Sequence, residues 1–309
     1  MKPVKNRLPS LLVAALASVF VLVVWGGVVR LSGSGLAIPD WPLAEGKLIP
    51  RAHPNVLIEY THRALAGIVG ILTLWVCVTI FRNARWRSRL GAPAVAALIT
   101  LALQIFMGAR VVLEELPVDR VVAHLLLAFV FFAILLRMAL VAREMGEGGA
   151  DVAVPGAPAA GSSAGSTGAH RGLGRWAKVA AVLVFAQAGL GAWVSSSGAA
   201  LACPDFPTCH GQWLPKMEGL IGIQFAHRLG AYLVSLVILG LLFRAAPRPL
   251  PARARWPLRI SGILLAMQFT LGVMNVVLHV PLPVGAGHLG TALVLYGTLI
   301  VASHELSRA

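Results

Sequence analysis

The sequence predicts an all-α integral membrane protein: eight transmembrane helices form two tandem four-helix bundles, related by a pseudo-twofold axis along the membrane normal. Composition is the first observation. Of the 309 residues, 58% are hydrophobic and 12% are charged, and the mean hydropathy is +0.80, which leaves too little polar surface for a soluble protein. Long apolar runs are the second observation, and an internal repeat at a fixed offset is the third.

The apolar runs predict the helices in chain order. Each run has about 19 residues or more, enough at ~1.5 Å per residue to cross a hydrocarbon core of about 30 Å. The first run follows Lys2, Lys5 and Arg7 and resembles a signal peptide, but its repeat partner is internal, so it is interpreted as a membrane helix. The predicted helices cover residues 10–30, 57–81, 91–113, 121–142, 176–195, 221–243, 258–279 and 284–303.

The repeat relates stretches 165 residues apart. Segment 36–42, Leu-Ala-Ile-Pro-Asp-Trp-Pro, matches segment 201–207, Leu-Ala-Cys-Pro-Asp-Phe-Pro. Segment 59–63, Glu-Tyr-Thr-His-Arg, matches segment 224–228, Gln-Phe-Ala-His-Arg. Two similar units are therefore expected, each with two histidines. Later matches have an offset of 164: Gln104 with Gln268, Gly108 with Gly272, and His124 with His288.

The repeat also predicts the domain boundaries. Residues 1–143 form the N-terminal half and residues 176–309 the C-terminal half. Residues 144–175 between them are rich in Gly, Ala and Ser, a composition typical of a flexible linker. Because each half has an even number of helices, both halves point the same way across the membrane.

The formal net charge of +14 is interpreted as a topology signal rather than a nucleic-acid footprint. Basic residues gather before the first helix and in segments 82–89, 171–178 and 244–259, all on one side of a chain with eight spans. Basic loops favour the cytoplasm. A multi-pass protein of the cell inner membrane with both termini in the cytoplasm is therefore expected, and the linker would be cytoplasmic.

Four histidines are the candidate metal ligands. His62 and His227 lie near the outer ends of the second and sixth predicted helices, and His124 and His288 near those of the fourth and eighth. A lone histidine in a membrane helix is usually a hydrogen-bonded packing residue. Four at repeat-related positions favour two imidazole pairs, each able to hold a haem iron, whereas zinc would need further ligands. The remaining histidines are expected to be solvated: His53, His170, His210, His279 and His304.

Charged residues accompany the first histidine of each half. Arg63 and Arg228 need carboxylate partners, which haem propionates would supply, unless the two arginines extend toward the outer interface. Glu59 lies three residues before His62, but its counterpart is the uncharged Gln224. Glu59 is either a catalytic acid or base, confined to the first half, or a structural partner of Arg63.

The cysteines differ in setting. Cys77 is expected to be a buried apolar residue. Cys203 and Cys209 lie in an outer loop, on the oxidising side, and are expected to form a disulfide. The first copy has Ile38 and Ala44 at these positions, so two interpretations remain open: a structural crosslink or a redox-active pair.

These motifs together resemble the haem A synthase family over the whole chain outside the linker and the tails. The resemblance implies an oxidoreductase that oxidises the C8 methyl of haem O to the formyl group of haem A, for terminal oxidases. It implies that His62 and His124, with Arg63, bind the substrate haem, and that Glu59 assists the oxidation. It also implies that His227 and His288, with Arg228, bind a haem b cofactor. Many members carry a cysteine pair in the first outer loop, where this sequence has Ile38 and Ala44.

The resemblance further implies haem O synthase and terminal oxidase assembly factors as partners, with an electron acceptor that the sequence does not identify. A homo-oligomer is left open, and no nucleic acid is expected. One alternative is a bis-histidine b-type membrane cytochrome that only transfers electrons. Another is a duplicated transporter, which is disfavoured because its polar groups would gather at the membrane midplane.

Overall fold

The computed structural model describes residues 7–47, 49–147 and 164–308, and within these ranges the chain forms eight long α-helices and no β-strand. All eight are long and apolar enough to cross a membrane, which confirms the predicted all-α membrane class. The helices are α1 (Leu8–Leu31), α2 (Pro54–Phe81), α3 (Ala84–Leu113), α4 (Val118–Glu147), α5 (Ala164–Ser196), α6 (Gly219–Ala245), α7 (Ala252–Val277) and α8 (Leu282–Leu306), with a short 3₁₀ turn, η1 (Ala199–Leu201), after α5.

All eight described helices begin earlier than the predicted apolar runs, and local signals set the first turns of α2 and α3. Pro54 opens α2, where a residue without a backbone N–H leaves no bond unmade. Asn83 caps α3, since its side-chain oxygen accepts hydrogen bonds from the backbone amides of Arg85 and Trp86. These polar turns lie outside any hydrophobic window, so hydropathy alone does not find them.

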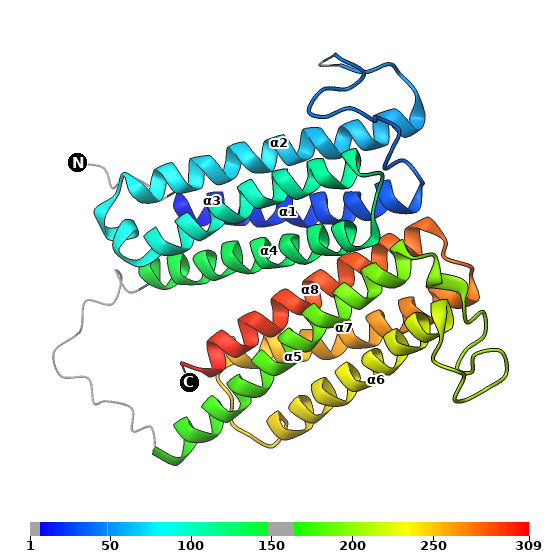
Figure 1. Ribbon diagram of the computed structural model, residues 1–309. Helices are drawn as coiled ribbons and strands as arrows, with labels where there is room; N and C mark the ends of the chain where they lie inside the picture. The colour runs from blue at the N-terminus through cyan, green and yellow to red at the C-terminus, as the bar shows by residue number, and fades with distance from the viewer. Residues whose placement is uncertain (1–6, 48, 148–163, 309) are drawn as a thin grey trace.

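The helices pack in two groups (Figure 1). Helices α1–α4 form one closed ring, with α1 against α2, α2 against α3, α3 against α4, and α4 back against α1. Helices α5–α8 repeat the same ring. The halves meet along α1, α4, α5 and α8, through the pairs α4–α5, α1–α8 and α4–α8.

Aromatic rings pack in the contact between the halves. Phe129 of α4 lies with its ring centroid 5.5 Å from that of Tyr296 in α8 and 6.5 Å from that of Phe185 in α5. Near the outer ends of α1 and α5, the guanidinium of Arg30 donates to the backbone oxygen of Ser195. Apolar packing and a hydrogen bond therefore both join the halves.

Both ends of the predicted linker belong to helices. Helix α4 continues through residues 144–147 and α5 already includes residues 164–175, so both ends of the predicted segment 144–175 are helical. Extending an existing helix needs no new nucleus, so isolated glycines are tolerated there. The rest of the predicted linker, residues 148–163, lies outside the described residues.

Two histidines expected to be solvated are buried at the linker end of the molecule. His304 is 9% exposed and His170 is 7% exposed. His304 lies between Arg137 and Glu144 of α4 and hydrogen-bonds to both, so the other half covers it. The expectation was wrong because a position near a helix end does not reveal that a second bundle packs over it. In contrast, His53, His210 and His279 are exposed.

Candidate functional site

Each of the four candidate histidines rests against a glycine of a neighbouring helix. A Cβ added to Gly26 of α1 would lie 3.0 Å from Cε1 of His62 in α2, and one on Gly191 of α5 would lie 3.0 Å from Cε1 of His227 in α6. The imidazole therefore occupies space that any other residue would fill. Gly108 with His124 and Gly272 with His288 repeat this contact at 3.3 Å.

The structure brings the histidines together in two pairs. His62 of α2 is close enough to His124 of α4 for the two imidazoles to interact electrostatically, and the same holds for His227 of α6 and His288 of α8. Each histidine lies roughly two turns inside the outer end of its helix. Each ring of four helices thus holds one pair, contributed by helices that are not sequence neighbours, as the repeat predicts.

The pairs fit a haem iron better than a small metal ion. Nδ1 of His62, His124 and His288 is buried without a hydrogen-bond partner. Within the described residues, no group of three or more His, Cys, Asp or Glu side chains is placed to hold a metal ion. Two imidazoles without a further ligand suit axial haem ligation, in which the porphyrin supplies the other iron ligands.

Side-chain amides accompany the second pair. Nε2 of Gln187 lies 2.9 Å from Nδ1 of His227 and donates to the backbone oxygen of His227 at 2.7 Å. Nε2 of Gln268 lies 3.2 Å from Nε2 of His288. The repeat predicts Gln268, which matches Gln104, but not Gln187, whose counterpart is Leu22.

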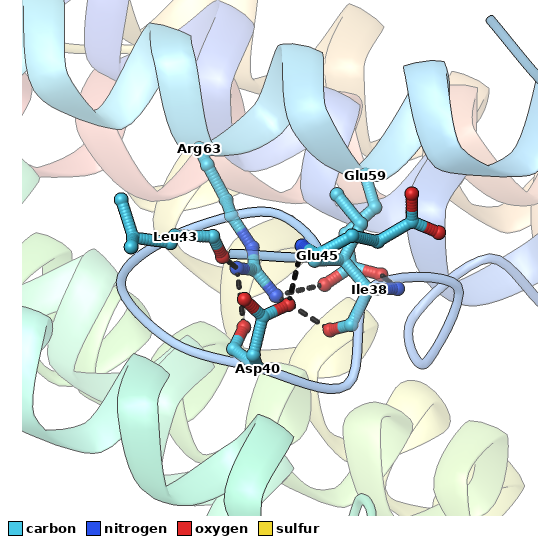
Figure 2. Close-up of polar contacts among 6 residues, drawn as sticks. All are labelled: Ile38, Asp40, Leu43, Glu45, Glu59 and Arg63. Atoms are coloured by element: carbon cyan, nitrogen blue, oxygen red, sulfur yellow. Dashed lines mark hydrogen bonds and ion pairs between the residues drawn. The ribbon is translucent and has the colours of Figure 1, made fainter. Parts of the chain in front are cut away.

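Arg63 holds the first outer loop onto α2 (Figure 2). Its Nη1 donates to the backbone oxygens of Asp40 (2.7 Å) and Leu43 (2.9 Å), and its Nη2 donates to that of Ile38 (2.8 Å) and to Oε1 of Glu59 (2.6 Å). Four acceptors therefore occupy its two terminal nitrogens. The observed partner is the loop, rather than the outer interface.

Arg228 makes the equivalent contacts in the second half. Its Nη1 donates to the backbone oxygen of Thr208 (2.6 Å) and its Nη2 to that of Cys203 (2.7 Å). The guanidinium carbon also lies 5.8 Å from the ring centroid of Phe206, a cation–π contact. Its Nε is buried without a partner. The duplicated Arg therefore fixes the duplicated loop.

Glu59 and Gln224 are both buried but bonded differently. Glu59 is 3% exposed, and its Oε2 accepts from the backbone amide of Ile38 at 2.9 Å while Oε1 accepts from Arg63. Gln224 donates to the backbone oxygen of Ala200 at 3.2 Å, and its Oε1 has no partner. The structure therefore contains the ion pair between Glu59 and Arg63 that the sequence suggested as an alternative to a catalytic role.

An aspartate organises the turn of each outer loop. Asp40 accepts from the backbone amides of Glu45 (2.8 Å) and Gly46 (2.9 Å). Asp205 accepts from the Thr208 hydroxyl and from the amides of His210 (2.6 Å) and Gly211 (2.9 Å). The Thr208 hydroxyl and these amides hold the pKa of Asp205 well below its usual range. The repeated Pro-Asp-aromatic-Pro segment was the signal for this role, which sequence reasoning missed.

Cys203 and Cys209 form the predicted disulfide. Both are fully buried and pack against Phe225 of α6. At the same positions of the first loop, Ile38 and Ala44 are buried against Val56 of α2. The disulfide thus fills the place of an apolar contact, as a structural crosslink does.

The fold and these sites define a class: a polytopic helical membrane protein with two duplicated pairs of histidines suited to haem. Residues 9–300 match the family described as Cytochrome oxidase assembly protein (COX15-CtaA). The chain belongs to that family.

Curated relatives are similar along nearly their whole length. The Heme A synthase of Shewanella oneidensis is 28% identical over 97% of this chain and 97% of its own. That of Symbiobacterium thermophilum is 33% identical over 87% of this chain and 88% of its own. That of Nitrosospira multiformis is 30% identical over 94% of this chain and 91% of its own.

Proposed function

We propose that this protein is a haem A synthase, an oxidoreductase that converts the C8 methyl group of haem O to the formyl group of haem A. The observation that carries the proposal is the duplicated histidine pair, each imidazole resting on a glycine. Family membership along residues 9–300 and full-length relatives named Heme A synthase support it.

The two halves have different roles in this proposal. His62 and His124 of the first half bind the substrate, and His227 and His288 of the second half bind a resident haem b. The difference between Glu59 and Gln224 supports this division, because the buried residue one turn before the first histidine is a carboxylic acid in the first half and an amide in the second. A second haem, when bound, supplies a one-electron acceptor near the site of oxidation.

The reaction proceeds by successive hydroxylations through a hydroxymethyl substrate intermediate. Written as a half-reaction, in which water stands for the inserted oxygen whatever its source, conversion of the methyl to the formyl group releases four protons and four electrons. Glu59 is the residue placed to handle protons. It lies one turn from His62 on the same helix, and its ionised form can accept a proton. Oε1 of Glu59 already accepts from Arg63 and Oε2 from the amide of Ile38, so a proton gained by Glu59 weakens contacts that hold the loop over residues 38–43.

Arg63 and Arg228 keep their outer loops closed over the ends of α2 and α6. Propionate binding by these arginines remains a prediction. It is supported by the buried, unpartnered Nε of Arg228, which is available to an anionic group without loss of the loop contacts.

The cellular setting follows from charge and substrate. Basic segments on one side of the eight spans support a protein of the cell inner membrane, with both termini in the cytoplasm and the histidine pairs near the outer face. Haem O synthase and terminal oxidase assembly factors are the partners that would supply the substrate and receive the product.

Pigment analysis tests the function. The purified protein, expressed with and without a haem O synthase, is extracted and its haems are separated by chromatography. Haem A that appears only with the haem O supply is the expected result. Haem b alone under both conditions would instead identify an electron-transfer cytochrome.

A further inference from the structure

The second half contains an amide contact to its histidine pair that has no counterpart in the first half. Gln187 of α5 lies one turn from Gly191, the glycine on which His227 rests. Its Nε2 lies 2.9 Å from Nδ1 of His227. The repeat places Leu22 at the same position of α1, and Leu22 has no hydrogen-bonding group in its side chain. Nδ1 of His62 accordingly has no partner.

A second, matched difference makes room for this amide. A Cβ on Gly230 of α6 would lie 2.1 Å from Oε1 of Gln187, so only glycine admits the side chain. The repeat places Leu65 at the position of Gly230. The two halves therefore differ at two neighbouring positions together. The second half has Gln187 with Gly230, and the first half has Leu22 with Leu65.

The chemistry of haem-ligating histidines explains what the pair does. When Nε2 of an imidazole binds iron, the proton resides on Nδ1, and a fixed acceptor for that proton sets the ring orientation and raises the basicity of the ligand. In the structure Nε2 of Gln187 faces Nδ1 and donates to the backbone oxygen of His227, so Oε1 accepts from an Nδ1–H only when the amide turns by half a turn and gives up that backbone contact. A more basic ligand favours ferric iron and a lower reduction potential.

We infer that Gln187 is a positioning residue for His227, and that the Gln187–Gly230 pair makes the second half the one that retains its haem. Leu22 and Leu65 leave His62 without such support, which suits a site that must release its product. The inference rests on the proposed function, because it assigns the resident haem to the second half.

The test compares Gln187→Leu with Gln187→Glu in the holoprotein, expressed without haem O. Haem transfer to excess apomyoglobin and the midpoint potential of the bound haem are measured. Leucine is similar in size but accepts no hydrogen bond, so haem loss should accelerate about tenfold and the potential should rise. Glutamate is a stronger acceptor, so the potential should fall below that of the wild type. Each tenfold change in ferric over ferrous preference corresponds to about 59 mV.

Two further variants control for packing. Val182→Leu changes an exposed apolar position of α5 and should leave both readouts unchanged. Gly230→Ala, whose Cβ meets the Gln187 amide, should reproduce Gln187→Leu and serves if that variant does not fold. The reciprocal Leu22→Gln, Leu65→Gly double variant should slow release of haem from the first half about tenfold.

The outcomes separate the two proposals. Potentials of Gln187→Leu and Gln187→Glu that match the wild type, or that shift in the same direction, overturn the role of Gln187. A wild-type protein with no low-spin haem spectrum overturns the resident haem itself, and with it the proposed function. Shifts in opposite directions support the inference.

Discussion

Oε1 of Glu59 accepts a hydrogen bond from Nη2 of Arg63 at 2.6 Å, while the equivalent Gln224 donates its amide to the backbone oxygen of Ala200. The arginine holds its loop in both halves, with or without a carboxylate. In the second half the arginine holds its loop without a carboxylate, with a disulfide that also crosslinks that loop. What Glu59 adds to the first half is a carboxyl group, buried one turn from His62.

Replacing Glu59 with glutamine should therefore separate folding from oxidation. The variant reproduces the arrangement of the second half, so it should fold and bind haem, at a cost of about 1–3 kcal/mol for the weakened buried contacts. Without a proton acceptor, the oxidation should stall, with haem O or a hydroxymethyl intermediate accumulating. Extracted pigments, separated by chromatography and identified by mass, measure the effect.

Gln224→Glu is the matched control for Glu59→Gln. It introduces a carboxylate at the equivalent buried position of the second half and should leave conversion to haem A possible. Haem A production at the wild-type level by Glu59→Gln would remove Glu59 from the mechanism and leave it with a structural role.

The glycine contacts predict a steric effect on haem binding. Gly191→Ala places a Cβ 3.0 Å from Cε1 of His227, which displaces the ring or costs about 1–3 kcal/mol in overpacking. The ratio of bound haem to protein should fall, as measured by the Soret absorbance. Gly240→Ala is the control, because no atom lies within 4 Å of its added Cβ and alanine favours the helix by roughly 0.5–1 kcal/mol. Equal haem content in both variants would show that the ring does not depend on Gly191.

The repeat predicts features that both copies share and misses those confined to one. It predicted the eight helices and the two histidine pairs, because hydropathy and matched positions report them directly. Gln187 escapes such a comparison, since Leu22 stands opposite it. The burial of His304 also escapes it, because that burial arises from contact with Arg137 and Glu144 of the other half. The sequence of one helix does not reveal which other helix packs against it.

The role of Arg63 shows a different limit. A guanidinium next to a candidate haem ligand predicts propionate binding, and the structure shows in addition that Arg63 donates to backbone oxygens of residues 38–43. The outer loop reaches back to α2 through a turn. Asp40 fixes this turn by accepting hydrogen bonds from two backbone amides. Backbone acceptors carry no sequence signature, so the structure was needed to find them.

The second histidine pair should determine the haem spectrum of the protein. His227→Ala and His288→Ala each remove one axial ligand, so the low-spin spectrum should disappear even where haem remains bound. His279→Ala is the control, since His279 is exposed near the outer end of α7. Low-temperature electron paramagnetic resonance distinguishes the spin states. A low-spin signal that survives both substitutions would move the resident haem elsewhere.

The outer loop of the second half should loosen in acid. Hydrogen bonds from Thr208 and from the turn amides depress the pKa of Asp205, so its contribution to stability is fully present above the ordinary aspartate pKa of about 3.9. That contribution disappears as the pH falls toward the lower pKa of the folded state. Reduction of the Cys203–Cys209 disulfide by a phosphine, which acts in acid, should accelerate over this range. Asp205→Ala should be reduced rapidly at every pH, and an unchanged rate in that variant would contradict the role of Asp205.

The two interpretations of the disulfide make opposite predictions for one double variant. Cys203→Ile with Cys209→Ala gives the second loop the residues of the first, where Ile38 and Ala44 pack without a crosslink. If the disulfide is structural, the variant keeps its haem and forms haem A, and loses only the roughly 2 kcal/mol that a short crosslinked loop contributes. Thermal unfolding and pigment analysis of the same preparation measure both quantities. Because both cysteines are fully buried against Phe225, exchange with another thiol would require the loop to open, so the structural outcome is expected. Normal haem content with no haem A would instead make the pair redox-active.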